Sequence, residues 1–313
     1  MRALILAAGL GTRLYPLTLA RAKAAVPVDG EPLVRRTARW LAGQGFRDLV
    51  VNLHHRPETI TAVLGDGGDL GVHIRYSWES PVLGSAGGPR HALPLLLDRS
   101  AERTCVVVNG DTLTSVDLAA MIDHHRRAGA LVTMALIPNP RPDKYGGVLL
   151  DAHGSVTGFT RRGSPDASFH FIGPQVIEAD AFMDLEDGVP AESVLDLYPR
   201  LMRARPGAVA GFVSDAAFSD IGTPADLLAT SLALAAADGR RDRPRWGRGV
   251  RVEPGARVVR SMLWDGVHVE AGASVTGCIV ADTVVIPAGA TYADCAIVSD
   301  AGALVATPLS GVA

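Results

Sequence analysis

The C-terminal part of the chain consists of three tandem segments, 249–265, 266–282 and 283–300, which align with one another at periods of 17, 17 and 18 residues. The positions that correspond are Val250, Val267 and Val284; Gly255, Gly272 and Gly289; and Ser261, Cys278 and Cys295. An apolar–glycine–small rhythm every six residues predicts a hexapeptide β-helix with one triangular coil per repeat. Cys278 and Cys295 should then lie one coil above the other.

The first 236 residues alternate between short apolar runs and amphipathic stretches. Strands are expected at 2–8, 48–53, 72–76, 104–109, 131–136, 147–150 and 169–177, and helices at 57–64, 116–127, 224–237 and from Leu33 to Gly43. This βαβα rhythm predicts an α/β fold with a mostly parallel sheet, on which ligands bind beyond the carboxyl ends of the strands. The helix at 224–237 begins with a proline, which suits the first helical position.

We expect three parts: an α/β domain over 1–238, an arginine-rich linker over 239–248 and the β-helix over 249–313. The linker has an alternative interpretation as a patch for an anionic partner. The 30 Lys and Arg against 33 Asp and Glu give a net charge of −3, which argues against a nucleic-acid partner. No apolar run reaches the roughly 18 residues that span a bilayer, so no membrane partner is expected.

Three scattered cysteines are too few for a disulfide framework or a zinc ribbon, and a cytoplasmic location fits them best. The paired histidines, His54-His55 and His124-His125, are interpreted as surface or helix-end residues. His268 has no obvious partner in the sequence, which argues against the alternative that the β-helix is an acyltransferase with this histidine as its base.

A glycine-rich turn, Gly9 to Arg13, follows the first expected strand. Backbone N–H groups can converge there on an anion, because glycine lacks the Cβ that would block its approach. The dinucleotide fingerprint is excluded by Leu14 in place of the third glycine, and the P-loop by the absence of Gly-Lys-Ser/Thr. Arg13 can bind phosphate oxygens bidentately. An ordinary turn with a surface arginine remains the alternative.

An apolar strand ends at Asn109 and is followed by Gly110 and Asp111. A carboxylate at the carboxyl end of a strand is well placed to hold a hard cation such as Mg²⁺. Asp220 supplies a second carboxylate just before the helix at 224–237, where a capping role is the alternative. A second glycine-rich loop spans 79–88.

The stretch from Leu6 to Val28, LAAGLGTRLYPLTLARAKAAVPV, resembles the signature of the sugar-1-phosphate nucleotidyltransferases. The resemblance extends to about residue 236, and a β-helix tail also recurs in this family. It implies a Rossmann-like mixed-sheet domain followed by a short left-handed β-helix. It further implies the reaction of a nucleoside triphosphate (NTP) with a sugar 1-phosphate to give an NDP-sugar and pyrophosphate, with Mg²⁺ as cofactor.

The same resemblance assigns roles to individual residues. The nucleotide site would comprise Leu6, Ala8, Gly9, Gly11, Thr12, Arg13, Glu79 and Gly84. The sugar-phosphate site would comprise Thr112, Gly146, Arg162, Gly173 and Glu192. The catalytic groups would be Arg13, Lys23, Asp111 and Arg162, and the metal ligands would be Asp111 and Asp220.

Two departures from the family pattern stand out. Ala22 replaces the usual proline before Lys23, and Arg161-Arg162 replaces a Glu-Lys pair, which leaves the identity of the sugar open. The chain looks most like mannose-1-phosphate guanylyltransferases, which use GTP. UTP or dTTP with glucose 1-phosphate is the alternative, and a catalytically silent regulatory subunit is another. The flat faces of the β-helix favour a homo-oligomer.

Overall fold

The structure is a computed structural model that describes residues 1–98 and 102–309. The chain divides into two compact units. The first comprises Met1–Gly9, Thr37–His55 and Leu64–Phe218, and the second comprises Leu10–Arg36, Arg56–Val63 and Ser219–Ala313. Most of the N-terminal signature therefore belongs to the same unit as the C-terminal coils.

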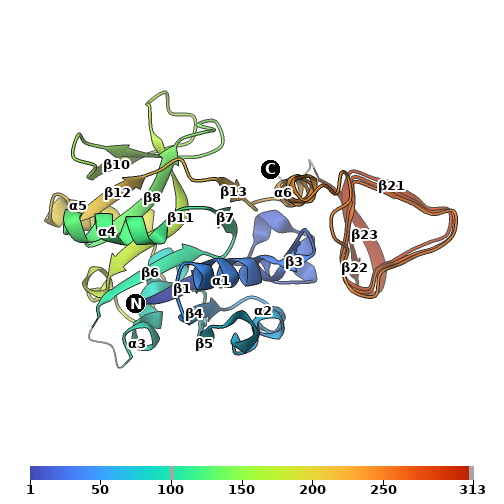
Figure 1. The fold of residues 1–313 in the computed structure, drawn as a ribbon, viewed down its shortest axis with the longest axis horizontal. Coiled ribbons are helices and arrows are strands. Elements are labelled where there is room, and N and C mark those ends of the chain that lie inside the picture. Colours follow the sequence, from blue (N-terminus) through green and yellow to red (C-terminus); the bar gives the residue numbers. More distant parts are fainter. Residues whose placement is uncertain (99–101, 310–313) are drawn as a thin grey trace. The chain divides into compact units, whose positions relative to one another are not determined.

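A nine-stranded mixed sheet forms the first unit (Figure 1). Its hydrogen-bonded order is β10-β9-β11-β6-β1-β4-β5, with β8 paired to β11 and β12 paired to β8. The strands are β1 (Arg2–Leu6), β4 (Asp48–Leu53), β5 (His73–Trp78), β6 (Thr104–Asn109), β8 (Val132–Pro138), β9 (Gly147–Leu150), β10 (Val156–Thr160), β11 (Phe169–Glu178) and β12 (Val209–Val213).

The central strands β6, β1, β4 and β5 are parallel, and β11 runs antiparallel to both β6 and β8. Ala3, Leu4 and Ile5 of β1 are fully buried, as expected for a parallel strand that is covered on both faces. The predicted α/β fold class is confirmed. Only parallel pairs join the N-terminal strands of this sheet, whereas its strands after β8 pair antiparallel except for β12, which runs parallel to β8.

Four of the six α-helices follow the sequence pattern closely, whereas the third and fifth were not predicted. They are α1 (Leu33–Gly43), α2 (Pro57–Leu64), α3 (Gly84–Leu97), α4 (Leu118–Ala128), α5 (Tyr198–Ala204) and α6 (Pro224–Ala237). Shorter elements are η1 (Thr12–Leu14), η2 (Leu17–Leu19), η3 (Lys23–Ala25), η4 (Gly68–Leu70), η5 (Ala179–Phe182), η6 (Ser193–Leu197), β2 (Pro27–Val28), β3 (Glu31–Pro32), β7 (Thr112–Thr114) and β13 (Phe218–Asp220). At the start of α6, Thr223 and Asp226 form a reciprocal capping box.

One expectation needs correction. The expected glycine-rich loop at 79–88 becomes helical from Gly84, and the glycines there serve close packing. A Cβ on Gly87 would lie 2.7 Å from Val189 O. His125 lies in the last turn of α4, a helix-end position as expected, and is 2% exposed, with its Nδ1 2.8 Å from Thr133 Oγ1, because α4 packs this side chain onto β8.

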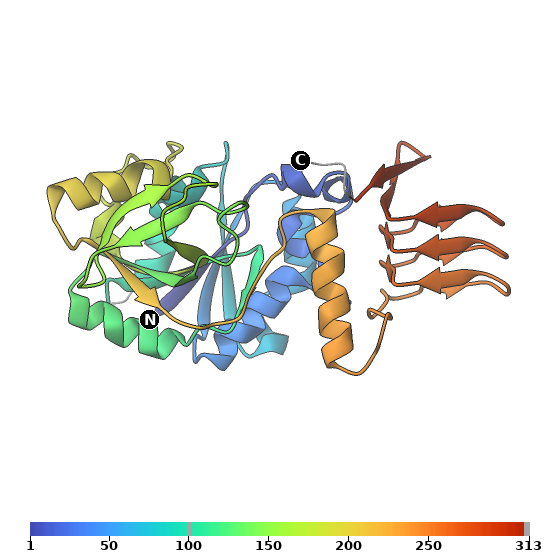
Figure 2. The ribbon, with the colours of Figure 1, turned by 90° about the horizontal axis from the view of Figure 1, so that it is seen from above.

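Three parallel ladders form the coils of the C-terminal β-helix, which Figure 1 shows end-on as a triangle and Figure 2 shows as a stack. One face carries β14 (Arg251–Val252), β17 (His268–Val269) and β20 (Val285–Ile286). The second carries β15 (Arg257–Val259), β18 (Ser274–Thr276) and β21 (Thr291–Ala293), and the third β16 (Met262–Leu263), β19 (Ile279–Val280) and β22 (Cys295–Asp300). This confirms the predicted left-handed β-helix.

The coils stack in the register that the repeats indicate. Arg251 pairs with His268, and His268 pairs with Val285. The Sγ atoms of Cys278 and Cys295 lie 3.6 Å apart, one coil above the other as predicted. β23 (Ala303–Pro308) then turns back antiparallel to β22, which the repeat pattern did not predict.

Candidate active site

Asn52, near the carboxyl end of β4, organises the backbone that follows β1. Its side chain is buried, and its Oδ1 accepts hydrogen bonds from the N–H groups of Ala7 at 2.5 Å and Ala8 at 3.3 Å. Its Nδ2 donates to Glu79 Oε1 at 2.7 Å. One amide group therefore ties the start of the first glycine-rich loop to the segment before α3. Sequence reasoning missed Asn52, although a polar residue within the apolar run of β4 was a signal for it.

The Glu79 carboxylate is held on both oxygens. Oε1 accepts the bond from Asn52, and Oε2 accepts the N–H of Leu83 at 2.7 Å. A Cβ on Gly88 would lie 2.7 Å from Oε1, so this glycine makes room for the carboxylate. The structure thus shows Glu79 shaping the turn that leads into α3, and the nucleobase contact stays a prediction.

Asp111 lies beyond the carboxyl end of β6, beside the end of β1. The two strands are parallel, and Leu6 pairs with Asn109. The Gly110 N–H donates to Leu6 O at 2.9 Å, and a Cβ on Gly110 would lie only 2.6 Å from that oxygen. Tight backbone packing therefore brings Asp111 and the start of the glycine-rich loop to the same edge of the sheet.

Gly173 and Thr112, two of the predicted sugar-phosphate residues, are neighbours. Gly173 has a φ of 105°, and its Cβ would lie 2.9 Å from Thr112 Oγ1. The pairing of β11 with β8 is irregular between Phe171 and Gln175, which surrounds this glycine. The irregularity lets β11 pass close to the start of β7.

Gly84 and Glu192 also come together, although the sequence assigned them to different substrates. A Cβ on Gly84, where φ is 76°, would lie 2.7 Å from Glu192 Oε1. The Ser85 hydroxyl donates to Glu192 Oε2 at 2.6 Å, and the Ser193 N–H donates to the same hydroxyl oxygen at 2.8 Å. The start of α3 is therefore fastened to the segment that leads into η6.

Gly146 lies against the segment that carries Arg162. A Cβ on Gly146 would lie 2.8 Å from Thr160 O and 3.9 Å from Arg162 N. Behind Gly146, the rings of Tyr145 and His170 stack with centroids 4.1 Å apart. Sequence reasoning did not single out His170, because its position follows from the pairing of β11.

Burial lowers the pKa of His170 to about 4, although a hydrogen bond with the Gly146 backbone opposes this shift. The nearby positive charge of Lys144 lowers the pKa further. His170 is therefore neutral at pH 7, and its ring serves as an uncharged stacking partner for Tyr145.

In the second unit, the glycine-rich turn packs directly on Lys23. Gly11 has a φ of 64°, and a Cβ there would lie 2.8 Å from the Cβ of Lys23 and 2.9 Å from Thr18 Cγ2. Thr12 and Arg13 follow in η1 and are exposed. Arg13 and Lys23, two cationic side chains predicted to bind phosphate, therefore lie in two short elements, η1 and η3, that pack together at Gly11.

Asp220 shares this neighbourhood. A Cβ on Gly222 would lie 2.9 Å from Asp220 Oδ2, 3.1 Å from Arg13 Nη1 and 3.3 Å from Asp226 Oδ2. The absence of a side chain at Gly222 lets a carboxylate and a guanidinium approach the same point. A predicted metal ligand and a predicted phosphate ligand are thus brought together within this unit.

A family model described as "Nucleotidyl transferase" matches residues 2–237. The chain belongs to this nucleotidyl transferase family. The resemblance drawn from Leu6 to Val28 is thereby confirmed, and the chain is a nucleotidyltransferase.

Among the family's curated members, the mannose-1-phosphate guanylyltransferase of Mycobacterium tuberculosis is 29% identical over 265 residues, covering 82% of this chain and 73% of that protein. The N-acetylmuramate alpha-1-phosphate uridylyltransferase of Neisseria meningitidis is 34% identical over 227 residues, covering 71% and 94%. The chain spans as little as 55% of the length of one curated relative and 95% of another. The crystal structure of HddC from Yersinia pseudotuberculosis shares the fold, with a TM-score of 0.63 at 23% identity, covering 73% of this chain and 97% of that one.

The donor chemistry of the nucleotidyltransferase fits a hard divalent cation, because Asp111 and Asp220 supply carboxylate oxygens. Among the residues that the structure describes, no group of three or more His, Cys, Asp or Glu side chains could hold a metal ion.

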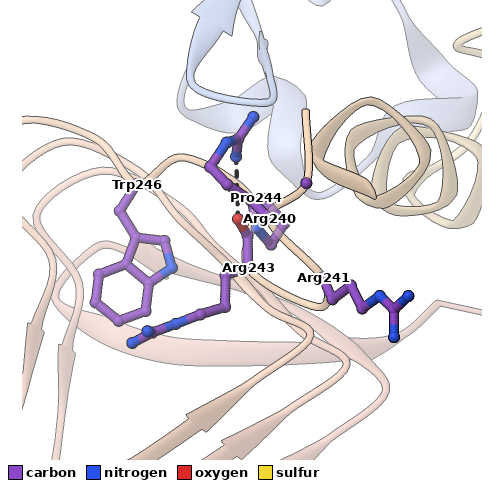
Figure 3. A pocket seen from close by; sticks show the side chains of 6 residues that line it. Arg240, Arg241, Arg243, Pro244 and Trp246 are labelled. Atoms are coloured by element: carbon purple, nitrogen blue, oxygen red, sulfur yellow. Dashed lines mark hydrogen bonds between the residues drawn. The ribbon is translucent and has the colours of Figure 1, made fainter. Parts of the chain in front are cut away.

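The arginine-rich segment lines a pocket of about 510 Å³, and all of its lining residues come from the range 239–246. Figure 3 shows the guanidinium groups of Arg240, Arg241 and Arg243 extending in different directions. Arg240 forms an ion pair with the buried carboxylate of Asp29, with 2.6 Å between Arg240 Nη2 and Asp29 Oδ2. Since the guanidinium groups do not converge, the arrangement favours the linker interpretation over an anionic-partner patch.

Two smaller points concern the rest of the nucleotidyltransferase. His268, for which the sequence offered no partner, has its Nε2 2.7 Å from Glu253 Oε1 on the neighbouring coil. Within the described residues, no helix is both long and apolar enough to cross a membrane.

Proposed function

We propose that this nucleotidyltransferase transfers a nucleotidyl group from an NTP to a sugar 1-phosphate and releases pyrophosphate. The guanylyl and uridylyl transferases among its relatives support this class of substrates by their names. The preferred pair is GTP with mannose 1-phosphate, in line with the name of a relative whose match covers 82% of this chain. UTP or dTTP with glucose 1-phosphate is the alternative.

Gly9 is the observation that carries the proposal. It is exposed at the carboxyl end of β1, its φ is not positive, and a Cβ there would meet nothing within 4 Å. No described neighbour therefore requires a glycine at this position. An anion that approaches the backbone N–H groups does require one, because a Cβ would occupy its place.

The reaction needs positioning and charge neutralisation rather than a covalent intermediate. An oxygen of the sugar phosphate attacks the α-phosphorus in line, the new P–O bond forms, and the bond to the pyrophosphate oxygen breaks. In this proposal Arg13 and Lys23 hold the pyrophosphate portion. Arg162 binds the attacking phosphate, with Thr112, Gly146, Gly173 and Glu192 lining the sugar.

Asp111 and Asp220 are the residues that would hold Mg²⁺. The cation would supply positive charge against the phosphate oxygens. The hard oxygen donors of these two side chains suit this role. The position of Asp111 beside Leu6, and of Asp220 beside Arg13, supports it from each unit separately.

A grid of four nucleotides against several sugar 1-phosphates, read by pyrophosphate release, tests the proposal. We expect one nucleotide to give turnover well above the others. Asp111→Asn should lower the rate by about 10²–10³-fold, by analogy with the loss of one charge-stabilising contact. Asp180→Asn, which changes an exposed aspartate paired with Arg103, is the control and should leave the rate unchanged. Full turnover in Asp111→Asn would overturn the metal assignment.

The proposal includes a homo-oligomer that forms through the β-helix. Val252 and Val285 of its first ladder are 37% and 45% exposed, so this face offers apolar surface to another subunit. Light scattering of the full chain and of a chain ending at Asp238 tests this. An unchanged subunit number after truncation would contradict it.

A further inference from the structure

Arg21 joins the N-terminal loop to the β-helix within the second unit. Its side chain is only 12% exposed. Nε and Nη2 donate to the two carboxylate oxygens of Asp282, each at 2.7 Å, and Nη2 also donates to Asp265 Oδ2 at 2.7 Å. The guanidinium carbon lies 5.5 Å from the ring centroid of Trp264, which is buried. One guanidinium thus holds two coils and covers an indole ring.

The two aspartates occupy equivalent positions in consecutive coils, and the coils hold them from the other side. The Arg248 N–H donates to Asp265 Oδ1 at 2.7 Å, and the Asp265 N–H donates to Asp282 Oδ1 at 3.1 Å. The side chains of Asp265 and Asp282 are 49% and 24% exposed, so the better-buried part of this ion pair is the guanidinium with Asp282. The stacked coils therefore present Arg21 with a fixed pair of carboxylates.

The chain on either side of Arg21 is also anchored. Before it, η2 packs against β22 of the β-helix. After it, Ala22 is fully buried, and its N–H donates to Thr59 Oγ1 at 3.0 Å. Lys23 follows immediately and contacts Gly11 as described above. The segment around Arg21 is thus packed against the β-helix on one side and against the glycine-rich turn, through Lys23, on the other.

We propose that Arg21 is a positioning residue, through which the β-helix holds the loop carrying Arg13 and Lys23 in its substrate-binding conformation. This inference rests on the proposed function, which gives the loop its ligand. Arg21 itself touches no substrate. If Arg21 positions the loop, the β-helix contributes to nucleotide affinity, because a change at Asp265 or Asp282 affects the loop through the Arg21 guanidinium.

Steady-state kinetics of Arg21→Ala, Arg21→Lys and the Asp265→Asn/Asp282→Asn double variant test the proposal. If the loop adopts its binding conformation one tenth of the time, KM for the NTP rises about tenfold. KM for the sugar phosphate should change by less than about threefold, because its binding residues lie elsewhere. Arg21→Lys should recover part of the loss, since an ammonium keeps the charge but not the bidentate fork. Combining Arg21→Ala with the double variant should add little, because both changes remove the same interaction.

Arg260→Ala is the matched control, because its guanidinium pairs with Asp242 on an exposed part of the same unit. It should leave both KM values unchanged. Thermal unfolding of every variant separates a loss of folded protein from a change in affinity. An unchanged KM for the NTP in folded Arg21→Ala would overturn the proposal and leave Arg21 with a purely stabilising role.

Hydrogen–deuterium exchange provides a readout that does not need activity. Peptides covering residues 10–25 should exchange faster in Arg21→Ala and in the aspartate double variant, while peptides from 266–300 stay protected. If these variants exchange faster but the wild-type protein catalyses no nucleotidyl transfer, the coupling stands and the proposed function is rejected. Unchanged exchange at 10–25 in an active enzyme would reject the coupling alone.

Discussion

Replacing Asn52 by alanine removes the side chain that links the first glycine-rich loop to Glu79. Ala7 and Glu79 are only 5% and 6% exposed as residues, so neither the Ala7 N–H nor the Glu79 carboxylate regains a full partner from solvent. A hydrogen bond to a charged group contributes about 1.5–3 kcal/mol, and an unsatisfied buried N–H costs about 1–3 kcal/mol. The Ala8 bond is longer, at 3.3 Å, and adds little. Asn52→Ala should therefore lower the free energy of unfolding by about 3–5 kcal/mol.

Urea unfolding followed by circular dichroism measures this change, with the first transition assigned to a unit by parallel fluorescence. Asn139→Ala is the matched control, because the same side chain is removed where both of its Nδ2 contacts are long, at 3.4 Å. The control should cost less than about 1 kcal/mol. Equal losses for the two variants, or a loss below about 1 kcal/mol for Asn52→Ala, would refute the reasoning that the Asn52–Glu79 link organises the loop.

Three further predictions concern the loop, a buried carboxylate and a half-buried histidine. Gly9→Ala should leave thermal stability unchanged but raise KM for the NTP, whereas Gly11→Ala should lower stability, because its Cβ would fall 2.8 Å from another Cβ at a φ of 64°. Equal melting shifts for the two would contradict this. Asp29→Asn should cost about 3 kcal/mol in denaturant unfolding, because the carboxylate is buried against an arginine. Asp238→Asn, whose side chain is 50% exposed against the same arginine, should cost less than about 1 kcal/mol. The pKa of His170 is lowered from 6.5 to about 4, so the unfolded chain takes up a proton first, and stability should fall as the pH drops through this window. Unfolding curves at pH 7 and pH 5 should show a smaller drop for His170→Asn, and an identical drop would argue against the burial effect.

The sequence alone determined the type and approximate bounds of many elements, but it did not predict α3, α5, β10, β12 or β23. The repeats of 249–300 specified the coils and even the stacking of Cys278 on Cys295, because a β-helix places residues one period apart directly above each other. The apolar runs at β1 and β6 likewise specified buried parallel strands. These features are local or periodic, so a linear pattern contains them.

The tertiary structure decided which side chains meet. Asn52 reaches Glu79 across 27 residues, and Arg21 reaches Asp282 across 261. Neither pair has a spacing that a helix or a strand would impose. The antiparallel pairing of β11 with β6 and β8, and the proximity of Gly84 to Glu192, likewise join segments that are far apart in the sequence. Such contacts depend on the packing of the whole chain. The burial of apolar side chains fixes where the backbone lies, and this decides which polar groups are close enough to pair.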